Sequence, residues 1–145
     1  MTDYPWSTLP AGPTLRRIVA ERLGWHIRKI WVGSGGVEYD LFVYDHDDRI
    51  AFHYALTKDH LADEQAAVDQ AWHEAMEDED CPRWDEDLAE ALDLAYGMDR
   101  SVGPEDSMFR AWVRSDEFSA TAATEPLAVV RAWLRATDDD PAFFH

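Results

Sequence analysis

The sequence predicts an α+β fold in which a largely antiparallel sheet of about five strands is covered by helices. Runs of β-branched, aromatic and alternating apolar residues mark five segments as strands: 25–32, 37–44, 49–56, 108–114 and 118–121. The connections between consecutive strands are short, which favours antiparallel pairing. Apolar residues recur at helical spacing in the remaining segments, so the expected element order is α-β-β-β-α-α-β-β-α.

The first half of the chain is expected to hold one helix and three strands. Thr14 can cap a helix that ends at Gly24. The glycine-rich segment 33–36 permits the positive φ that a hairpin turn requires, and the polar segment 45–48 makes the next turn. Residues 25–56 are therefore predicted to form a three-stranded meander.

Two helices are expected in the middle of the chain. Thr57 or Asp59 can cap the first of them, which runs from about 61 to 76 with its acidic residues outward. The acidic triplet 85–87 lies where the second helix would begin, which suits the helix dipole, and Gly97 stops it.

The last third of the chain is expected to begin with a polar loop over 99–107, whose Gly103-Pro104 pair marks a turn. Two strands follow, and Thr124 caps a closing helix. Pro126 lies in the first turn of that helix, where its missing N–H removes no hydrogen bond.

The length of 145 residues predicts one domain. We expect an irregular N-terminal arm over 1–13, a single α+β domain over 14–137 and an acidic C-terminal tail over 138–145. The arm has no basic or apolar run, so we expect neither a signal peptide nor a membrane anchor. Cys81 is the only cysteine, which rules out an intramolecular disulfide and favours a reducing compartment. The predicted location is the cytoplasm.

Charge is the most unusual property of the sequence, because 30 acidic residues against 13 basic ones give a net charge of -17. The segment from Lys58 to Asp106 holds seventeen acids and three bases, a net of -14. Such a field repels nucleic acids and anionic membranes and attracts basic surfaces. Direct binding of nucleic acid or of a membrane is therefore not expected. The same charge is also typical of a solubility or host adaptation.

The leading interpretation is a non-enzymatic acidic protein that binds or inhibits a basic protein surface, in the manner of a DNA mimic or an immunity protein. The residues predicted to form its acidic surface are Asp63, Glu64, Asp69, Glu74, Glu77, Asp78, Glu79, Asp80, Asp85, Glu86, Asp87 and Glu90.

A second interpretation is a binding protein, or sponge, for a small anionic ligand such as a nucleotide signal. Aromatic and arginine residues are enriched at binding hot spots, although a second helix layer would bury the same tryptophans. The candidate ligand-binding residues are Trp31, His53, Arg110, Trp112 and Arg114.

No catalytic residue, metal ligand or cofactor is predicted. His73 follows Asp69 by one helical turn, but no third ligand completes a metal site. The acidic turn 45–48 lacks the glycine and the late Glu of a calcium loop. Ser34 lies between strands rather than on a strand-turn-helix elbow. An uncharacterised hydrolase is therefore only a third interpretation, and the sequence leaves the oligomeric state open, homo-oligomers included.

Three stretches together resemble the phage ABA-sandwich domain, a family of tailed-phage and prophage accessory proteins. They are the helix end at 23–25, the Pro-aromatic-cap-Ala pattern at 82–91, and the strand pair with its final helix at 109–113, 118–122 and 125–128. The resemblance implies an α+β architecture. It also implies an accessory phage gene, of a kind that often encodes inhibitors of host or defence proteins.

Overall fold

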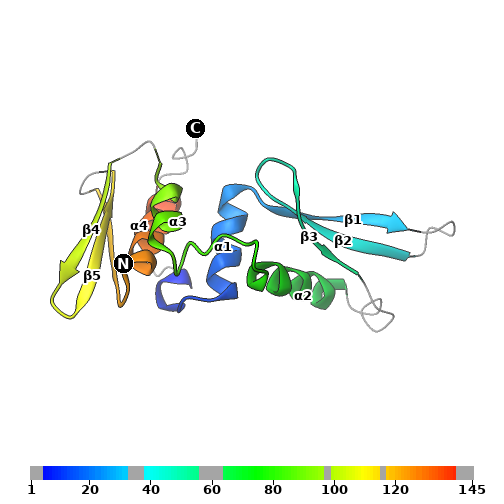
Figure 1. Cartoon of the computed structure of the whole chain (residues 1–145), viewed down its shortest axis with the longest axis horizontal. Helices are drawn as coiled ribbons and strands as arrows, with labels where there is room; N and C mark the ends of the chain where they lie inside the picture. Colours follow the sequence, from blue (N-terminus) through cyan, green and yellow to red (C-terminus); the bar gives the residue numbers. More distant parts are fainter. Residues whose placement is uncertain (1–4, 33–37, 56–63, 97–98, 115–116, 140–145) are drawn as a thin grey trace. The chain divides into compact units, whose positions relative to one another are not determined.

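A computed structural model describes residues 5–32, 38–55, 64–96, 99–114 and 117–139 of the chain (Figure 1). Its elements, in chain order, are the 3-10 helix η1 (Pro5–Thr8), α1 (Pro13–Leu23), β1 (His26–Val32), β2 (Glu38–Tyr44), β3 (Ile50–Tyr54), α2 (Glu64–Glu77), α3 (Leu88–Leu94), β4 (Arg100–Glu105), β5 (Met108–Val113), β6 (Phe118–Ala122) and α4 (Glu125–Asp139).

The predicted α+β class is confirmed, but the prediction of one sheet of about five strands is wrong. The described residues form two separate three-stranded antiparallel sheets, ordered β1-β2-β3 (sheet A) and β4-β5-β6 (sheet B). Each sheet packs its apolar face on a different helix, α2 for sheet A and α4 for sheet B. Two amphipathic helices between the strand groups allow two small cores instead of one.

The additional strand is β4, which occupies the segment predicted to be a polar loop. Val102 is its only large apolar residue, and Gly103 and Pro104 usually interrupt strands. β4 tolerates them because it is an edge strand that pairs only with β5. The tight turn follows instead at Asp106, whose φ is 57°.

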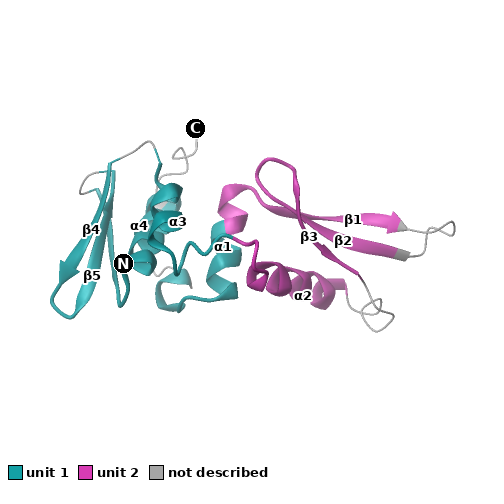
Figure 2. Cartoon of the chain, in the orientation of Figure 1, with its two compact units in different colours: residues 1–19, 82–145 teal, residues 20–81 magenta. Residues whose placement is uncertain are grey.

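The described residues divide into two compact units, with the boundary inside α1 (Figure 2). Unit 1 comprises residues 1–19 and 82–145, and unit 2 comprises residues 20–81. The predicted arm, single domain and tail stay predictions.

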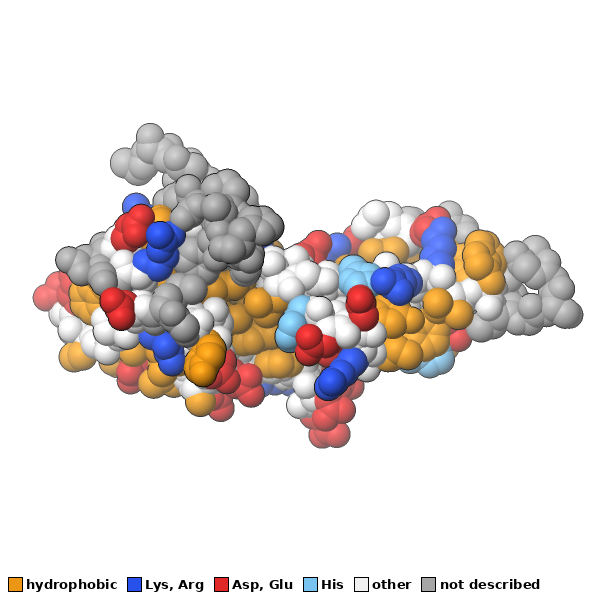
Figure 3. Space-filling model, turned by 90° about the horizontal axis from the view of Figure 1, so that it is seen from above, with side chains coloured by type: hydrophobic (Ala, Val, Ile, Leu, Met, Phe, Trp, Pro, Cys, Tyr) orange, Lys and Arg blue, Asp and Glu red, His pale blue; other side chains and the backbone are white. Residues whose placement is uncertain are grey.

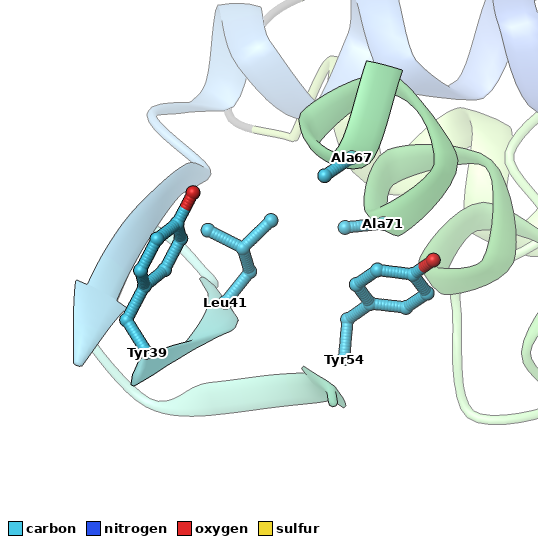
Figure 4. Close-up of a cluster of buried hydrophobic side chains, with 5 residues drawn as sticks. All are labelled: Tyr39, Leu41, Tyr54, Ala67 and Ala71. Atoms are coloured by element: carbon cyan, nitrogen blue, oxygen red, sulfur yellow. The ribbon is translucent and has the colours of Figure 1, made fainter. Parts of the chain in front are cut away.

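In unit 2, side chains from sheet A and α2 meet in one hydrophobic cluster. Tyr39 and Leu41 of β2 and Tyr54 of β3 point toward Ala67 and Ala71 of α2 (Figure 4). The small alanines let the helix lie close to the strands. This packing uses one face of sheet A and leaves the opposite face without a helix from its own unit.

In unit 1, α4 packs against sheet B and α3 packs against α4. Trp133 and Leu134 of α4 are fully buried, as are Ala111 and Val113 of β5. The N-terminal segment joins this core, because the Trp6 indole donates to Asp138 at 2.6 Å. Unit 1 is therefore assembled from the two ends of the described chain.

Several predicted boundaries shift or lie outside the described residues. The predicted hairpin turn 33–36 and the caps Thr57 and Asp59 cannot be compared, because they lie outside the described residues. The third helix begins at Leu88 with Asp87 as its N-cap, and not within 85–87 as predicted, because the Asp87 carboxylate accepts from the Glu90 N–H.

Candidate functional site

The acidic face comprises seven carboxylates on α2 and the turn that follows it, with no Lys or Arg between Glu64 and Asp80. We use the name acidic face for Glu64, Asp69, Glu74, Glu77, Asp78, Glu79 and Asp80. The helix buries Ala67, Ala71, Trp72, Ala75 and Met76, whereas the carboxylates are exposed or half-buried.

Several carboxylates of the acidic face already have partners within unit 2. Glu64 pairs with Lys29 of β1, and this hydrogen bond raises the pKa of the lysine. Glu77 lies 3.3 Å from His73, one helical turn earlier. Asp78 accepts the N–H of Asp80 at 2.9 Å and thereby shapes the turn. These are exposed interactions, which contribute little stability and leave the carboxylates accessible.

The acidic residues predicted in unit 1 behave differently. Asp85 is 1% exposed and accepts from the Arg16 guanidinium at 2.8 Å and from the Gly12 N–H at 2.6 Å. A second nitrogen of Arg16 reaches Glu86 at 2.9 Å. Asp85 is therefore a buried structural anion and no part of an accessible acidic surface. Glu90 lies in α3, and the remaining predicted residue, Asp63, lies outside the described residues.

Of the five candidate ligand-binding residues, Trp31 and His53 lie on sheet A, Arg110 and Trp112 lie on sheet B, and Arg114 follows β5 in a turn. Arg110 and Trp112 lie on the face of sheet B opposite α4, in register with Thr121 and Ser119. The Arg110 guanidinium is held by the Glu105 carboxylate, which raises its pKa, and it also donates to the Ser119 hydroxyl at 3.2 Å. This arginine is thus already neutralised by its own sheet.

Arg114, Trp31 and His53 also have local partners. Arg114 has a φ of 58°, pairs with Glu117 at 3.7 Å and lies over the Phe118 ring. Trp31 is 57% exposed and packs edge-on against Tyr39, whereas His53 is on the other face of sheet A. These five residues are not brought together into one site within either unit.

An open hollow of about 410 Å³ lies in unit 1 between α3 and β4, and none of the five candidates lines it. Its lining residues are Leu92, Asp99, Arg100, Ser101 and Val102. Asp99, Arg100 and Ser101 are exposed. The hollow is therefore shallow and lacks the enclosed, largely apolar walls of a typical ligand pocket.

On the face of sheet A opposite α2, the sequence predicted only His53 as a candidate binding residue. We call this the outer face; it includes His26, Arg28 and Ile30 of β1, Phe42 and Tyr44 of β2, and His53 of β3. Figure 3 shows basic, histidine and hydrophobic side chains side by side on unit 2. The signal was present in the alternation of β1, where Arg28 follows Ile27.

Stacked rings and cations organise the outer face. The His53 ring stacks on Phe42 with centroids 4.4 Å apart, and the His26 ring stacks on Tyr44 at 5.5 Å. The Arg28 guanidinium lies over the Tyr44 ring at 4.9 Å. Such cross-strand pairs stabilise a sheet by about 0.2–1 kcal/mol each.

The edges of the two sheets differ. In sheet B, Arg131 of α4 donates to the Thr121 carbonyl at 3.0 Å and Arg135 donates to the Ser119 carbonyl at 3.2 Å, both on the edge strand β6. The other edge strand contains Pro104, which has no N–H. In sheet A, no backbone hydrogen bond joins β1 to any described segment except β2. Sheet B is thus protected against further strand pairing, whereas β1 is open.

Comparison with protein-family models, curated proteins and solved structures finds no match to this chain. The resemblance to the phage ABA-sandwich family therefore stays a prediction. Within the described ranges, no three metal-ligating side chains cluster, and no helix has both the length and the apolarity to cross a membrane.

Proposed function

We propose that the chain is a non-enzymatic binding protein that presents its acidic face to a basic protein surface. The observation that carries the proposal is the run of seven carboxylates from Glu64 to Asp80 without one Lys or Arg. Four of these carboxylates lie in α2 and three in the turn that follows it, and all are exposed except the half-buried Glu74 and Asp78. Complementary charge of this kind mainly raises the rate of association and selects the partner.

The proposal narrows the surface predicted from sequence. Asp85 is excluded because it is buried, and Glu86, Asp87 and Glu90 are excluded because they belong to unit 1. The acidic face as defined above lies entirely within unit 2. A basic host or defence protein, met in the cytoplasm, is the partner class that we propose.

The experiment is affinity capture from host lysate at about 0.1 M and 0.5 M salt, followed by binding measurements with the purified partner. Exposed charges are screened beyond about 8 Å at physiological ionic strength, so binding through the acidic face should weaken steeply with salt. The triple variant Glu77→Gln, Glu79→Gln, Asp80→Asn removes three charges and keeps Asp78, which shapes the turn.

The matched control is Asp47→Asn, Asp93→Asn, Asp106→Asn, which removes the same charge from three exposed positions outside the acidic face. We expect the first variant to weaken binding by about tenfold or more and the control to change it by less than about threefold. Equal effects of the two variants would show that net charge alone matters, and the acidic face would then have no specific role.

A further inference from the structure

We propose that the open edge of β1 binds an extended acidic peptide segment, which adds a fourth strand to sheet A. This site lies on β1, meets the acidic face at the pair of Lys29 with Glu64, and goes beyond the function proposed above. Peptide recognition by strand addition obtains affinity from main-chain hydrogen bonds and specificity from alternate side chains.

The backbone of β1 is suited to accept a strand. β1 is seven residues long and pairs with β2 over its whole length without a register shift. Every second residue of an edge strand directs both its N–H and its carbonyl away from its neighbour. No described segment of the chain bonds these groups in β1, whereas arginines bond two carbonyls of β6.

The other edge of sheet A is a poorer site. β3 has five residues, and its register with β2 shifts at Val43 and Tyr44. β3 also carries no Lys or Arg, whereas β1 carries Arg28 and Lys29. Length, register and charge therefore favour the edge at β1.

The charge of β1 identifies the class of peptide. In a chain with a net charge of -17, β1 carries His26, Arg28 and Lys29 and no acidic residue. The Arg28 side chain is 54% exposed and Lys29 38% exposed, on opposite faces of the sheet. Their present partners, Asp48 and Glu64, are themselves exposed, so a peptide carboxylate can share or replace them.

The next two residues of β1 add apolar contacts to the site. Ile30 is 39% exposed on the outer face, and Trp31 is 57% exposed on the face toward α2. A matching peptide therefore places two adjacent acidic residues beside Arg28 and Lys29 and two adjacent β-branched residues beside Ile30 and Trp31. A second copy of β1 is a worse match, because antiparallel pairing of two such strands brings their cations together.

The test uses the fluorescein-labelled peptide Ser-Thr-Val-Ile-Glu-Glu-Thr, which presents this pattern in antiparallel orientation, titrated into the full chain by fluorescence anisotropy. Control peptides replace Glu-Glu by Lys-Lys, or carry N-methyl groups at alternate amides, which block strand pairing. We expect binding of the acidic peptide and loss of binding for both controls.

The variant Arg28→Glu should weaken binding of the acidic peptide about three- to tenfold. Arg49→Glu makes the same charge change on an exposed residue before β3 and should leave the affinity within about twofold of wild type. Circular dichroism confirms that both variants fold. Absence of binding, equal effects of the two variants, or undiminished binding of the N-methylated peptide would each overturn the proposal. Sedimentation that shows a dimer dissociated by N-methylated peptide, with no acidic-peptide complex, would overturn it in favour of a second copy.

Discussion

Sheets A and B have the same size and connectivity, but their edges are treated differently. Both are three-stranded antiparallel sheets with one face on a helix. In sheet B, Arg131 and Arg135 bond carbonyls of one edge strand, and Pro104 leaves the other edge strand short of one N–H donor. In sheet A, β1 is longer and cationic, and among the described residues its backbone bonds only to β2. Charged side chains discourage the pairing of like edges, so Arg28 and Lys29 of β1 would disfavour a second basic strand and favour an acidic one.

The two units also differ in how deeply their ion pairs are buried. Unit 1 holds the buried ion pair of Arg16 and Asp85, which are 5% and 1% exposed, beside exposed pairs such as Arg110 with Glu105. Unit 2 keeps its ion pairs at the surface, as between Lys29 and Glu64 or between His53 and Asp40. Buried ions fix a structure, whereas exposed ones can exchange partners. Unit 1 therefore has the features of a scaffold and unit 2 those of a binding surface.

The largest expected effect on stability is that of Asp85→Ala, which leaves the buried Arg16 guanidinium without its closest carboxylate. We expect the free energy of unfolding to fall by about 3–5 kcal/mol. Urea unfolding followed by tryptophan fluorescence measures it. The exposed control Asp93→Ala in α3 should change stability by less than about 0.5 kcal/mol. A loss below about 1 kcal/mol for Asp85→Ala would mean that the buried pair does not hold unit 1 together.

A second change opens the protected edge of sheet B. Arg131→Met keeps the apolar stem but removes the donors to the Thr121 and Leu9 carbonyls. We expect the free energy of unfolding in urea to fall by about 1–3 kcal/mol, because two partly buried carbonyls lose a charged donor. Arg135→Met, which removes an exposed hydrogen bond, should cost less than about 1 kcal/mol. Equal losses for the two variants would show that burial of Arg131 is unimportant.

A smaller effect is expected on the stability of unit 2 as the pH is raised. Burial, with a contribution from Glu74, raises the pKa of Tyr54 above its ordinary value of 10.0, and the bond to Glu64 raises the pKa of Lys29 above 10.5. A raised pKa means that the folded state holds the proton more tightly. The contribution to stability is complete below pH 10 and is lost as pH rises through the folded pKa.

We therefore expect stability to decline above pH 10, and Tyr54→Phe to make that decline shallower. Thermal unfolding between pH 8 and pH 11 measures it, with Tyr96→Phe as the control, because the Tyr96 side chain is 80% exposed. Identical pH profiles for wild type and Tyr54→Phe would show that Tyr54 is not the group responsible.

The smallest expected effect is that of Arg110→Gln in sheet B. Its ion pair with Glu105 is exposed, so the variant should lose about 1 kcal/mol or less. A thermal-shift panel of nucleotides provides the second measurement. A ligand that stabilised the wild type but not Arg110→Gln would give sheet B a binding function and contradict the division of roles between the units.

The local elements were largely predictable from the sequence. The alternation of apolar and polar residues predicted β2. Tyr39, Leu41 and Val43 are all buried, as expected for residues on one face of a strand. The closing helix was predicted from the same kind of pattern and is observed as α4. These elements are specified by short-range periodicity, which any sequence reading can detect.

The arrangement of those elements was not predictable in the same way. β4 carries one large apolar residue and is held by pairing with β5, so its own residues give almost no strand signal. Asp85 resembled every other acid of its segment, because its burial depends on Arg16, 69 residues away. The open edge of β1 likewise depends on which strands pair, and residue spacing alone cannot determine that.

The most direct test of the account is amide hydrogen exchange, resolved by residue with NMR, with and without the acidic peptide. The account predicts that added protection falls on alternate amides of β1 between His26 and Val32, with β4 and β6 unchanged. Added protection on sheet B, or none on β1 at saturating peptide, would contradict the division between a closed sheet and an open one.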